Sequence, residues 1–311
     1  MDPPSHRITR LAPSPTGALH LGNARTFLIN WALARQRGWR IVLRIEDLDG
    51  PRVKPQAAQQ AIDLLRWLGV DWDDGPWSQR HDLAPYQAAL EQLAVSGRTY
   101  PCTCTRKDIT AATSAPHLDD HELRYPGTCR TYPPIDGQAA ALRVVVPDED
   151  VVFDDVLCGR QVVNVQRQVG DFVVATKVAL PAYQLAVVVD DAAAAVSDVV
   201  RGDDLLNSTG RQLWLQRFLN LGPPPRYYHL PLVLGPDGRR LAKRHGDTRL
   251  LGYRQSGVSA DRVVGLLSHW CGIIDRRSPM SSADFRQNFN LDRLPREPVR
   301  FSKEDATWLD T

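Results

Sequence analysis

One stretch near the N-terminus constrains the fold more than any other part of this chain. Residues 8–12 are mostly apolar and predict a short strand, and residues 10–23 read RLAPSPTGALHLGN. Two prolines and a glycine in this segment prevent a helix or a strand from running through its middle. From Asn23 onward, apolar side chains recur at helical spacing, so we expect a helix with Asn23 as its N-cap and a stop near Gly38.

A second strand is expected at residues 41–45, directly before Glu46 and Asp47. Strand, loop, helix and strand in this order predict a βαβ unit with a right-handed crossover. Binding sites of such units lie at the carboxyl ends of the strands. The pattern therefore predicts one crevice that is surrounded by four polar residues, namely Arg10, Ser14, His20 and Glu46.

The residue types in this crevice indicate what it binds. A helix start attracts phosphate oxygens, and the His20 imidazole can donate to them. Gly22 would let a flat ring approach the backbone closely. Arg10 can form a forked pair with a carboxylate, and Glu46 can accept from an ammonium group. The sequence thus favours an acidic amino acid bound beside a nucleotide.

These motifs resemble those of the class I glutamyl-tRNA synthetases, in which APSPTGxLHxGN precedes LRIEDxD. The resemblance implies that His20 is catalytic and that ATP is bound by His20, Gly22 and Asn23. It also implies glutamate contacts from Arg10, Leu11, Ala12, Pro13, Ser14 and Glu46. The alternative for His20 is a capping or core histidine.

The second half of the nucleotide-binding fold is expected to begin at residues 181–191, where a nearly continuous apolar run predicts a buried parallel strand. A helix at 192–196 and a strand within 199–205 would follow. By the resemblance, Tyr183 and Arg201 line the glutamate pocket. For Arg201, the alternative is an ion pair with a neighbouring aspartate. Val187 departs from the family, which usually has asparagine there, so the pocket must handle glutamate differently.

Residues 238–246 form a basic, glycine-flanked segment suited to folding over a triphosphate. The segment is similar to the KMSKS loop of the class, and Lys243 takes the position of its second lysine, which implies catalytic and ATP-binding roles. Arg240 and Ala242 depart from the family pattern. The alternative is a basic loop without a ligand.

Three cysteines in one segment, Cys102, Cys104 and Cys129, predict a structural zinc ion, which prefers soft ligands in tetrahedral geometry. On chemistry alone, the fourth ligand would be His117 or His121. The resemblance implies Tyr125 instead, because a short branch of the family, the glutamyl-queuosine tRNA(Asp) synthetases, has C-x-C…Y-x-x-x-C. Three unrelated thiols are the alternative.

The expected fold is α/β, with a Rossmann-type class I synthetase catalytic domain, an inserted zinc-binding, β-rich subdomain and a short helical C-terminal region. We expect the first catalytic half at 1–99 and the insert at 100–180. The second half should span 181–246 and the helical stem 247–311. Within the insert, strands are expected at 141–146, 151–156, 162–165 and 171–174.

Composition adds limits to this interpretation. No apolar run reaches membrane-spanning length, and the chain start lacks the apolar core of a signal peptide. Five cysteines in 311 residues do not make a disulfide scaffold, so a cytoplasmic protein is expected. Residues 201–311 carry a surplus of basic side chains, which suits either a polyphosphate partner or an ordinary solvated surface.

The resemblance to the short branch implies an enzyme that activates glutamate with ATP and Mg²⁺ without needing tRNA. The glutamate would then be joined to queuosine of tRNA(Asp), because the chain has no room for a domain that reads the anticodon. We expect a monomer. The alternatives are a truncated glutamyl-tRNA synthetase that charges a tRNA 3′ end and an inactive paralogue that binds tRNA.

Overall fold

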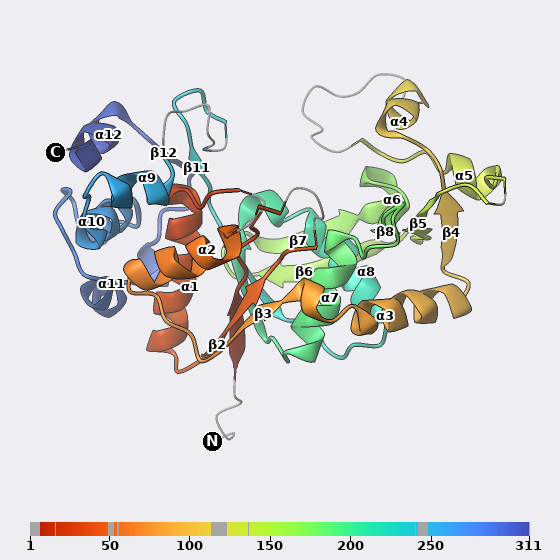
Figure 1. Cartoon of the computed structure of the whole chain (residues 1–311), viewed down its shortest axis with the longest axis horizontal. Coiled ribbons are helices and arrows are strands. Elements are labelled where there is room, and N and C mark those ends of the chain that lie inside the picture. The colour runs from red at the N-terminus through yellow and green to blue at the C-terminus, as the bar shows by residue number, and fades with distance from the viewer. Residues whose placement is uncertain are drawn as a thin grey trace. The chain divides into compact units, whose positions relative to one another are not determined.

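The computed structural model describes residues 7–15, 17–48, 53–54, 56–112, 123–135, 137–239, 241 and 248–310. The chain forms two compact units. The first unit comprises residues 1–79, 196–205 and 225–311, drawn mainly in red and blue in Figure 1. The second unit comprises residues 80–195 and 206–224, drawn mainly in yellow and green. Among the described residues, no helix is both long and apolar enough to cross a membrane.

A parallel sheet organises the first unit. Its strands lie in the order β3 (Asp74–Ser78), β2 (Arg40–Ile45), β1 (Ile8–Leu11), β9 (Asp198–Gly202) and β10 (Arg226–Leu230). The expected strands of the βαβ unit are confirmed, and β1 pairs in parallel with β2. Strand β3 pairs in parallel with β2 on the side away from β1. The sheet brings the ends of β1, β2 and β9 to one edge, although they are far apart in sequence.

Helix α1 (Leu21–Gln36) connects β1 to β2 and packs on one face of this sheet. The prediction that Asn23 is the N-cap is wrong, because the helix begins at Leu21 and His20 takes the N-cap position. Asn23 instead lies in the first turn, where its Oδ1 accepts from the His20 backbone N–H at 3.2 Å. The expected stop is confirmed, since Gly38 adopts a φ of 66° directly after the helix.

The remaining elements of the first unit follow β2 and β10. They are α2 (Ala57–Trp67), η3 (Asp203–Leu205), β11 (Val233–Leu234), α9 (Leu250–Gln255), α10 (Ala260–Trp270), α11 (Ser282–Asn288), η5 (Leu291–Arg293), β12 (Val299–Arg300) and α12 (Lys303–Asp310). The expected helical character of the C-terminal region is confirmed by α9, α10, α11 and α12. A short turn, η2 (Gln79–His81), leads from β3 toward the second unit.

The second unit combines helices with antiparallel strands. Its elements are α3 (Ala84–Val95), β4 (Thr99–Cys102), α4 (Arg106–Ala112), α5 (Thr128–Thr131), β5 (Ala141–Val144), β6 (Asp150–Asp155), β7 (Gly159–Asn164), α6 (Val165–Gln168), β8 (Phe172–Ala175), α7 (Tyr183–Ala193) and α8 (Ser208–Phe218). Strands β4, β5 and β8 form one sheet, while β6 and β7 form a hairpin. The expected β-rich character of this region is confirmed.

The prediction of a buried strand at 181–191 is wrong, and so is that of a separate helix at 192–196. A single helix, α7, occupies Tyr183–Ala193. It packs against α3 and α8, and Leu185 to Val189 are all buried. A helix that is covered on several sides needs the same continuous apolar run as a strand that is covered on both faces, so the pattern could not separate the two.

Candidate functional site

Three buried arginines project from the same face of the parallel sheet. Arg10 is paired with Val42 in β2 and lies beside Val199 in β9, so Arg44 and Arg201 share its parity. Their exposed fractions are only 3 to 5%. Helix α1 covers the opposite face, where Thr9 Oγ1 donates to Asn30 Oδ1. The result is a concentration of positive charge on one face near the carboxyl ends of the strands, which suits an anionic ligand.

The residues predicted at the ends of β1 and β2 lie together. The Glu46 backbone N–H donates to the Pro13 carbonyl at 3.1 Å, and Ser14 Oγ donates to the Glu46 carbonyl at 3.3 Å. Arg44 Nη2 donates to Glu46 Oε1 at 3.1 Å. Of the predicted glutamate contacts here, Leu11 and Pro13 are buried, Ala12 is half-buried and Ser14 is exposed. This edge therefore offers a carboxylate beside a buried cation, and that cation is Arg44, which the sequence had not indicated.

The start of α1 lies next to residues that follow the basic segment. The Leu21 N–H donates to the Thr248 carbonyl at 3.2 Å, and the Leu250 N–H donates to the Leu19 carbonyl at 2.9 Å. A Cβ at Gly22 would lie 3.1 Å from the His20 ring, which is closer than most real Cβ contacts. Glycine is thus needed so that the His20 ring can lie against the first turn.

Residues 240 and 242–247 lie outside the described residues, so the predictions for Arg240, Ala242 and Lys243 rest on the sequence. The same holds for His117 and His121. Tyr183 begins α7 in the second unit, and its exposed fraction is 42%. Val187 is buried within that unit, with 1% exposed.

Arg201 is held by a histidine that the sequence analysis did not single out. Arg201 Nε donates to His229 Nε2 at 3.0 Å, and the guanidinium lies 5.4 Å from the Tyr227 ring centroid. His229 is fully buried in β10, directly opposite Arg201 in β9. Because Nε2 accepts this hydrogen bond, the imidazole carries its proton on Nδ1. The signal that could have identified His229 is the pairing of β9 with β10, which the sequence alone does not reveal.

Two acidic residues, Asp203 and Asp204, follow directly after β9. Burial raises the pKa of Asp203 to about 6, and the negative charge of Asp204 acts in the same direction. At neutral pH the carboxylate is therefore ionised in an environment that opposes its charge.

The three predicted cysteine ligands converge in the second unit. Their sulfur atoms all lie within 4.8 Å of one another, and the Cys104 and Cys129 sulfurs are 3.4 Å apart. The Tyr125 hydroxyl joins them, since it accepts from the Cys102 thiol at 3.4 Å and from the Cys129 N–H at 2.8 Å. Sulfurs bound tetrahedrally to one zinc ion lie about 3.7 Å apart. The donor set therefore fits a metal of this kind with little movement.

The cysteines differ in acidity. Burial raises the pKa of Cys104 to about 11, and its hydrogen bond with Cys129 adds to the effect. For Cys129, burial acts in the same upward direction, but hydrogen bonds from the Thr103 backbone and from the Cys104 and Tyr125 side chains lower its pKa to about 6. A thiolate is thus available at neutral pH to begin metal binding.

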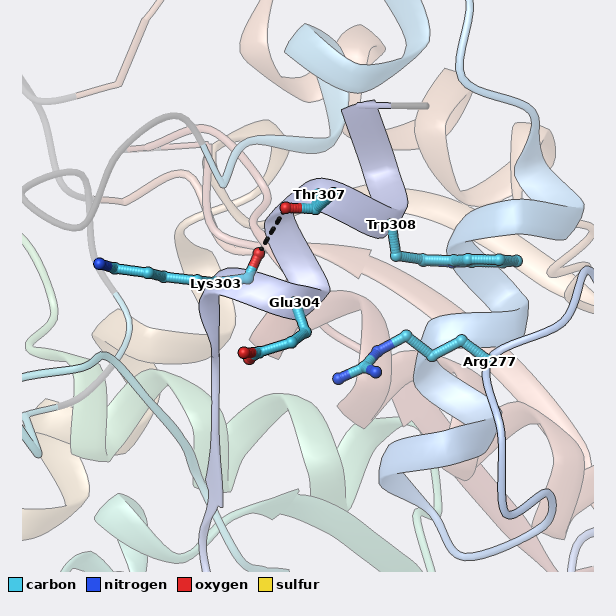
Figure 2. A pocket seen from close by; sticks show the side chains of 5 residues that line it. All are labelled: Arg277, Lys303, Glu304, Thr307 and Trp308. Carbon is cyan, nitrogen blue, oxygen red and sulfur yellow. Dashed lines mark hydrogen bonds between the residues drawn. The ribbon is translucent and has the colours of Figure 1, made fainter.

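A surface pocket of about 500 Å³ lies on the C-terminal helix α12 (Figure 2). It is lined by Arg277, Lys303, Glu304, Thr307 and Trp308. Arg277 is paired with the buried Asp305, and Thr307 Oγ1 donates to the Lys303 carbonyl at 3.0 Å. None of the predicted site residues lines this pocket, and its charges are mixed, so the candidate site remains at the sheet edge.

Comparison with known proteins defines the class. A family model described as tRNA synthetases class I (E and Q), catalytic domain, matches residues 7–308. The chain belongs to this family, so it is a ligase of the aminoacyl-tRNA synthetase type with a Rossmann-like α/β catalytic domain. Class I synthetases use ATP and Mg²⁺.

Individual members of the family are similar to this chain over nearly all of its length. The chain is 48% identical to a glutamyl-Q tRNA(Asp) synthetase of Symbiobacterium thermophilum, over 96% of this chain and 97% of the relative. It is 35% identical to a glutamate–tRNA ligase of Geotalea uraniireducens, over 97% of this chain but 64% of the relative. A glutamate tRNA ligase of Elizabethkingia meningosepticum has the same fold, with a TM-score of 0.81 at 23% identity, covering 98% of this chain and 69% of that one.

Proposed function

We propose that the chain condenses L-glutamate with ATP and transfers the glutamyl group to the cyclopentenediol of queuosine at the wobble position of tRNA(Asp). The observation that carries this proposal is the near end-to-end match with proteins named glutamyl-Q tRNA(Asp) synthetase, at 41 to 48% identity. The relative named glutamate–tRNA ligase is less similar, and the chain covers only part of its length.

The first step is an in-line displacement. A glutamate carboxylate oxygen attacks the α-phosphorus of ATP, a P–O bond forms, and the bond to the bridging oxygen breaks to release pyrophosphate. No strong base is needed, because the carboxylate is already ionised at neutral pH. In the second step, a hydroxyl of the cyclopentenediol attacks the carbonyl carbon, AMP leaves, and the hydroxyl proton passes to solvent.

The proposed roles start from the polar residues at the strand ends of the first unit and from the family resemblance. Arg10, Arg201 and Glu46 hold the charged groups of glutamate, with Leu11, Ala12, Pro13 and Ser14 forming the wall beside them. His20, Gly22 and Asn23 at the start of α1 receive the phosphates, where the positive end of the helix dipole favours negative charge. Lys243 stabilises the charge that develops on the triphosphate. The hydrogen bond between Leu21 and Thr248 supports this role, because Thr248 follows the basic segment by two residues in the sequence. For Tyr183, at the start of α7 in the second unit, the glutamate-binding role implied by the resemblance stays a prediction.

Cys102, Cys104, Tyr125 and Cys129 are proposed to hold one structural zinc ion per chain. When bound, the ion would tie β4 to α5 and to the segment that precedes α5. The four-part division at 1–99, 100–180, 181–246 and 247–311 remains a proposal, as does action by a monomer in the cytoplasm.

Two measurements test the proposal. Glutamate-dependent exchange of pyrophosphate into ATP should proceed without tRNA, and its complete absence would favour an inactive paralogue. Labelled glutamate should then be transferred to RNA from queuosine-containing cells and not to RNA from queuosine-lacking cells, with the label mapped to the anticodon. Charging at the 3′ end that is indifferent to queuosine would instead identify a glutamyl-tRNA synthetase.

A further inference from the structure

A buried arginine lies against the cysteine cluster. Arg143 belongs to β5 and has 7% of its surface exposed. Its Nε donates to the Cys102 sulfur at 3.2 Å, and its guanidinium carbon lies 3.6 Å from the centroid of the Tyr125 ring. One cation thus contacts two of the four proposed zinc ligands, one through a hydrogen bond and the other through the face of its ring.

The charge of the ligand set explains why a cation is useful there. Three thiolates around a divalent zinc ion leave a net negative charge, before any contribution from the tyrosine. Cys102, Tyr125 and Cys129 are buried, and a buried charge without a counter-charge is strongly unfavourable. The Arg143 guanidinium supplies that counter-charge at hydrogen-bond distance from one of the sulfurs.

The arginine is itself held in place by the sheet. Its Nη1 donates to the Asp171 carbonyl at 2.7 Å. The Asp171 carboxylate accepts from the Tyr100 hydroxyl at 2.8 Å and from the Val146 N–H at 2.9 Å. The guanidinium is therefore fixed before any metal arrives, which limits the cost of ordering it on binding.

We propose that Arg143 is a positioning residue for the metal centre: it offsets the charge of the thiolates and orients the Tyr125 ring so that its oxygen serves as the fourth ligand. This inference rests on the proposed zinc site. It assigns to Arg143 an effect on metal affinity and on the electronic state of the Cys102 sulfur, in addition to its packing in β5.

The test compares Arg143→Met, which removes the charge, with Arg143→Lys, which keeps it, in the full chain. Zinc affinity is measured by competition with a chromophoric chelator. We expect Arg143→Met to bind zinc about 10 to 100 times more weakly, as is usual when a group supporting a metal ligand is lost. Arg143→Lys should lose less. The matched control is Arg130→Met, because Arg130 approaches the same Asp171 at 3.6 Å from an exposed position; its affinity should stay within roughly twofold of the wild type.

Cobalt separates an electronic role from a structural one. At saturating Co²⁺, loss of the hydrogen bond to Cys102 should move the sulfur-to-cobalt charge-transfer absorption to longer wavelength in Arg143→Met, while Arg130→Met keeps the wild-type spectrum. Wild-type affinity together with a wild-type spectrum in Arg143→Met would overturn the inference and leave the zinc site standing. A wild-type chain that binds no zinc would overturn both. If Arg143→Met does not fold, the same two measurements on Arg143→Lys decide. A zinc affinity and a cobalt spectrum that both equal those of the wild type would contradict the orienting role.

Discussion

At the scale of single residues, Arg201 depends on a neutral imidazole. The hydrogen bond from its Nε to His229 Nε2 fixes the guanidinium on the same sheet face as Arg10. A protonated His229 could not accept this bond and would repel the arginine. The orientation of a proposed glutamate-binding group is thus set by a neighbour in the next strand.

We expect His229→Phe, which keeps the ring but removes the acceptor, to raise the KM for glutamate about tenfold in pyrophosphate exchange, because a hydrogen bond to a charged group is lost. The KM for ATP should change little. The control is Tyr228→Phe, since Tyr228 neighbours His229 and faces the opposite side of the sheet. Equal KM values for glutamate in His229→Phe and in the wild type would contradict this role.

Asp203 should make stability depend on pH. Its pKa is about 6 in the folded chain, above the ordinary value of 3.8, so folding is helped by the protonated form. This contribution is present below about pH 4, is lost as the pH rises through 6, and stays absent at pH 7. Asp203→Asn should therefore be more stable than the wild type at pH 7 by about 0.5 kcal/mol, after discounting for solvent screening.

The measurement is thermal unfolding of both proteins at pH 4 and pH 7. The gain of Asp203→Asn should largely vanish at the lower pH, where the folded wild type carries the proton and the unfolded wild type is protonated in part. A gain of the same size at both pH values would show that the carboxylate charge is not its cause.

The positions of single residues were predicted correctly where the residues belong to a contiguous motif. Ser14 and Glu46 were placed correctly at the strand ends, because β1 and β2 were both visible as apolar runs. His229 and Arg143 were missed, since each acts across a strand pairing that the sequence alone does not reveal. Tyr125 was reached only through the family resemblance, because chemistry by itself favoured a histidine.

At the scale of secondary structure, α7 shows that the hydrophobic pattern alone does not decide between a helix and a strand. Its apolar residues predicted a strand, yet α3 and α8 cover the segment as a helix. Helix α1 was predicted more closely, because its apolar positions recur on one face and its end carries a glycine. The start of α1 was predicted too late in the chain. His20 is the N-cap, and Asn23 accepts a hydrogen bond from the His20 backbone within the first turn.

Truncation of a buried side chain tests the packing of α7. Leu185 is fully buried there, so Leu185→Ala should lower the free energy of unfolding by about 3 kcal/mol. Val178→Ala is the matched control, since Val178 is 75% exposed and its loss should cost less than about 0.5 kcal/mol. Denaturant unfolding gives both values, and a similar small loss in the two variants would contradict the buried position of Leu185.

At the scale of the whole molecule, the chain passes from the first unit to the second and back twice. The expected domains were consecutive segments of the chain, because composition changes mark where a segment begins but not which earlier strand it later joins. The family resemblance predicts a parallel sheet such as the one formed by β2, β1, β9 and β10. It does not predict that residues 206–224 belong to the second unit.

Removal of metal should act on the whole chain through the second unit. We expect chelation to lower the Tm by about 4 °C or more, since the free energy of binding to the folded state is lost. Zinc should restore the Tm and Mg²⁺ should not, because thiolates prefer the softer ion. An unchanged Tm in chain whose zinc content has been measured before and after chelation would contradict a structural metal.

The position of β1 between β2 and β9 has a consequence for biosynthesis. While the ribosome is still making the middle of the chain, β1 has a partner on one side only, and its other edge is open to unwanted pairing. That edge can close only after residues 198–202 have emerged. Newly made chains should therefore need protection by chaperones for longer than their N-terminal βαβ unit alone would suggest.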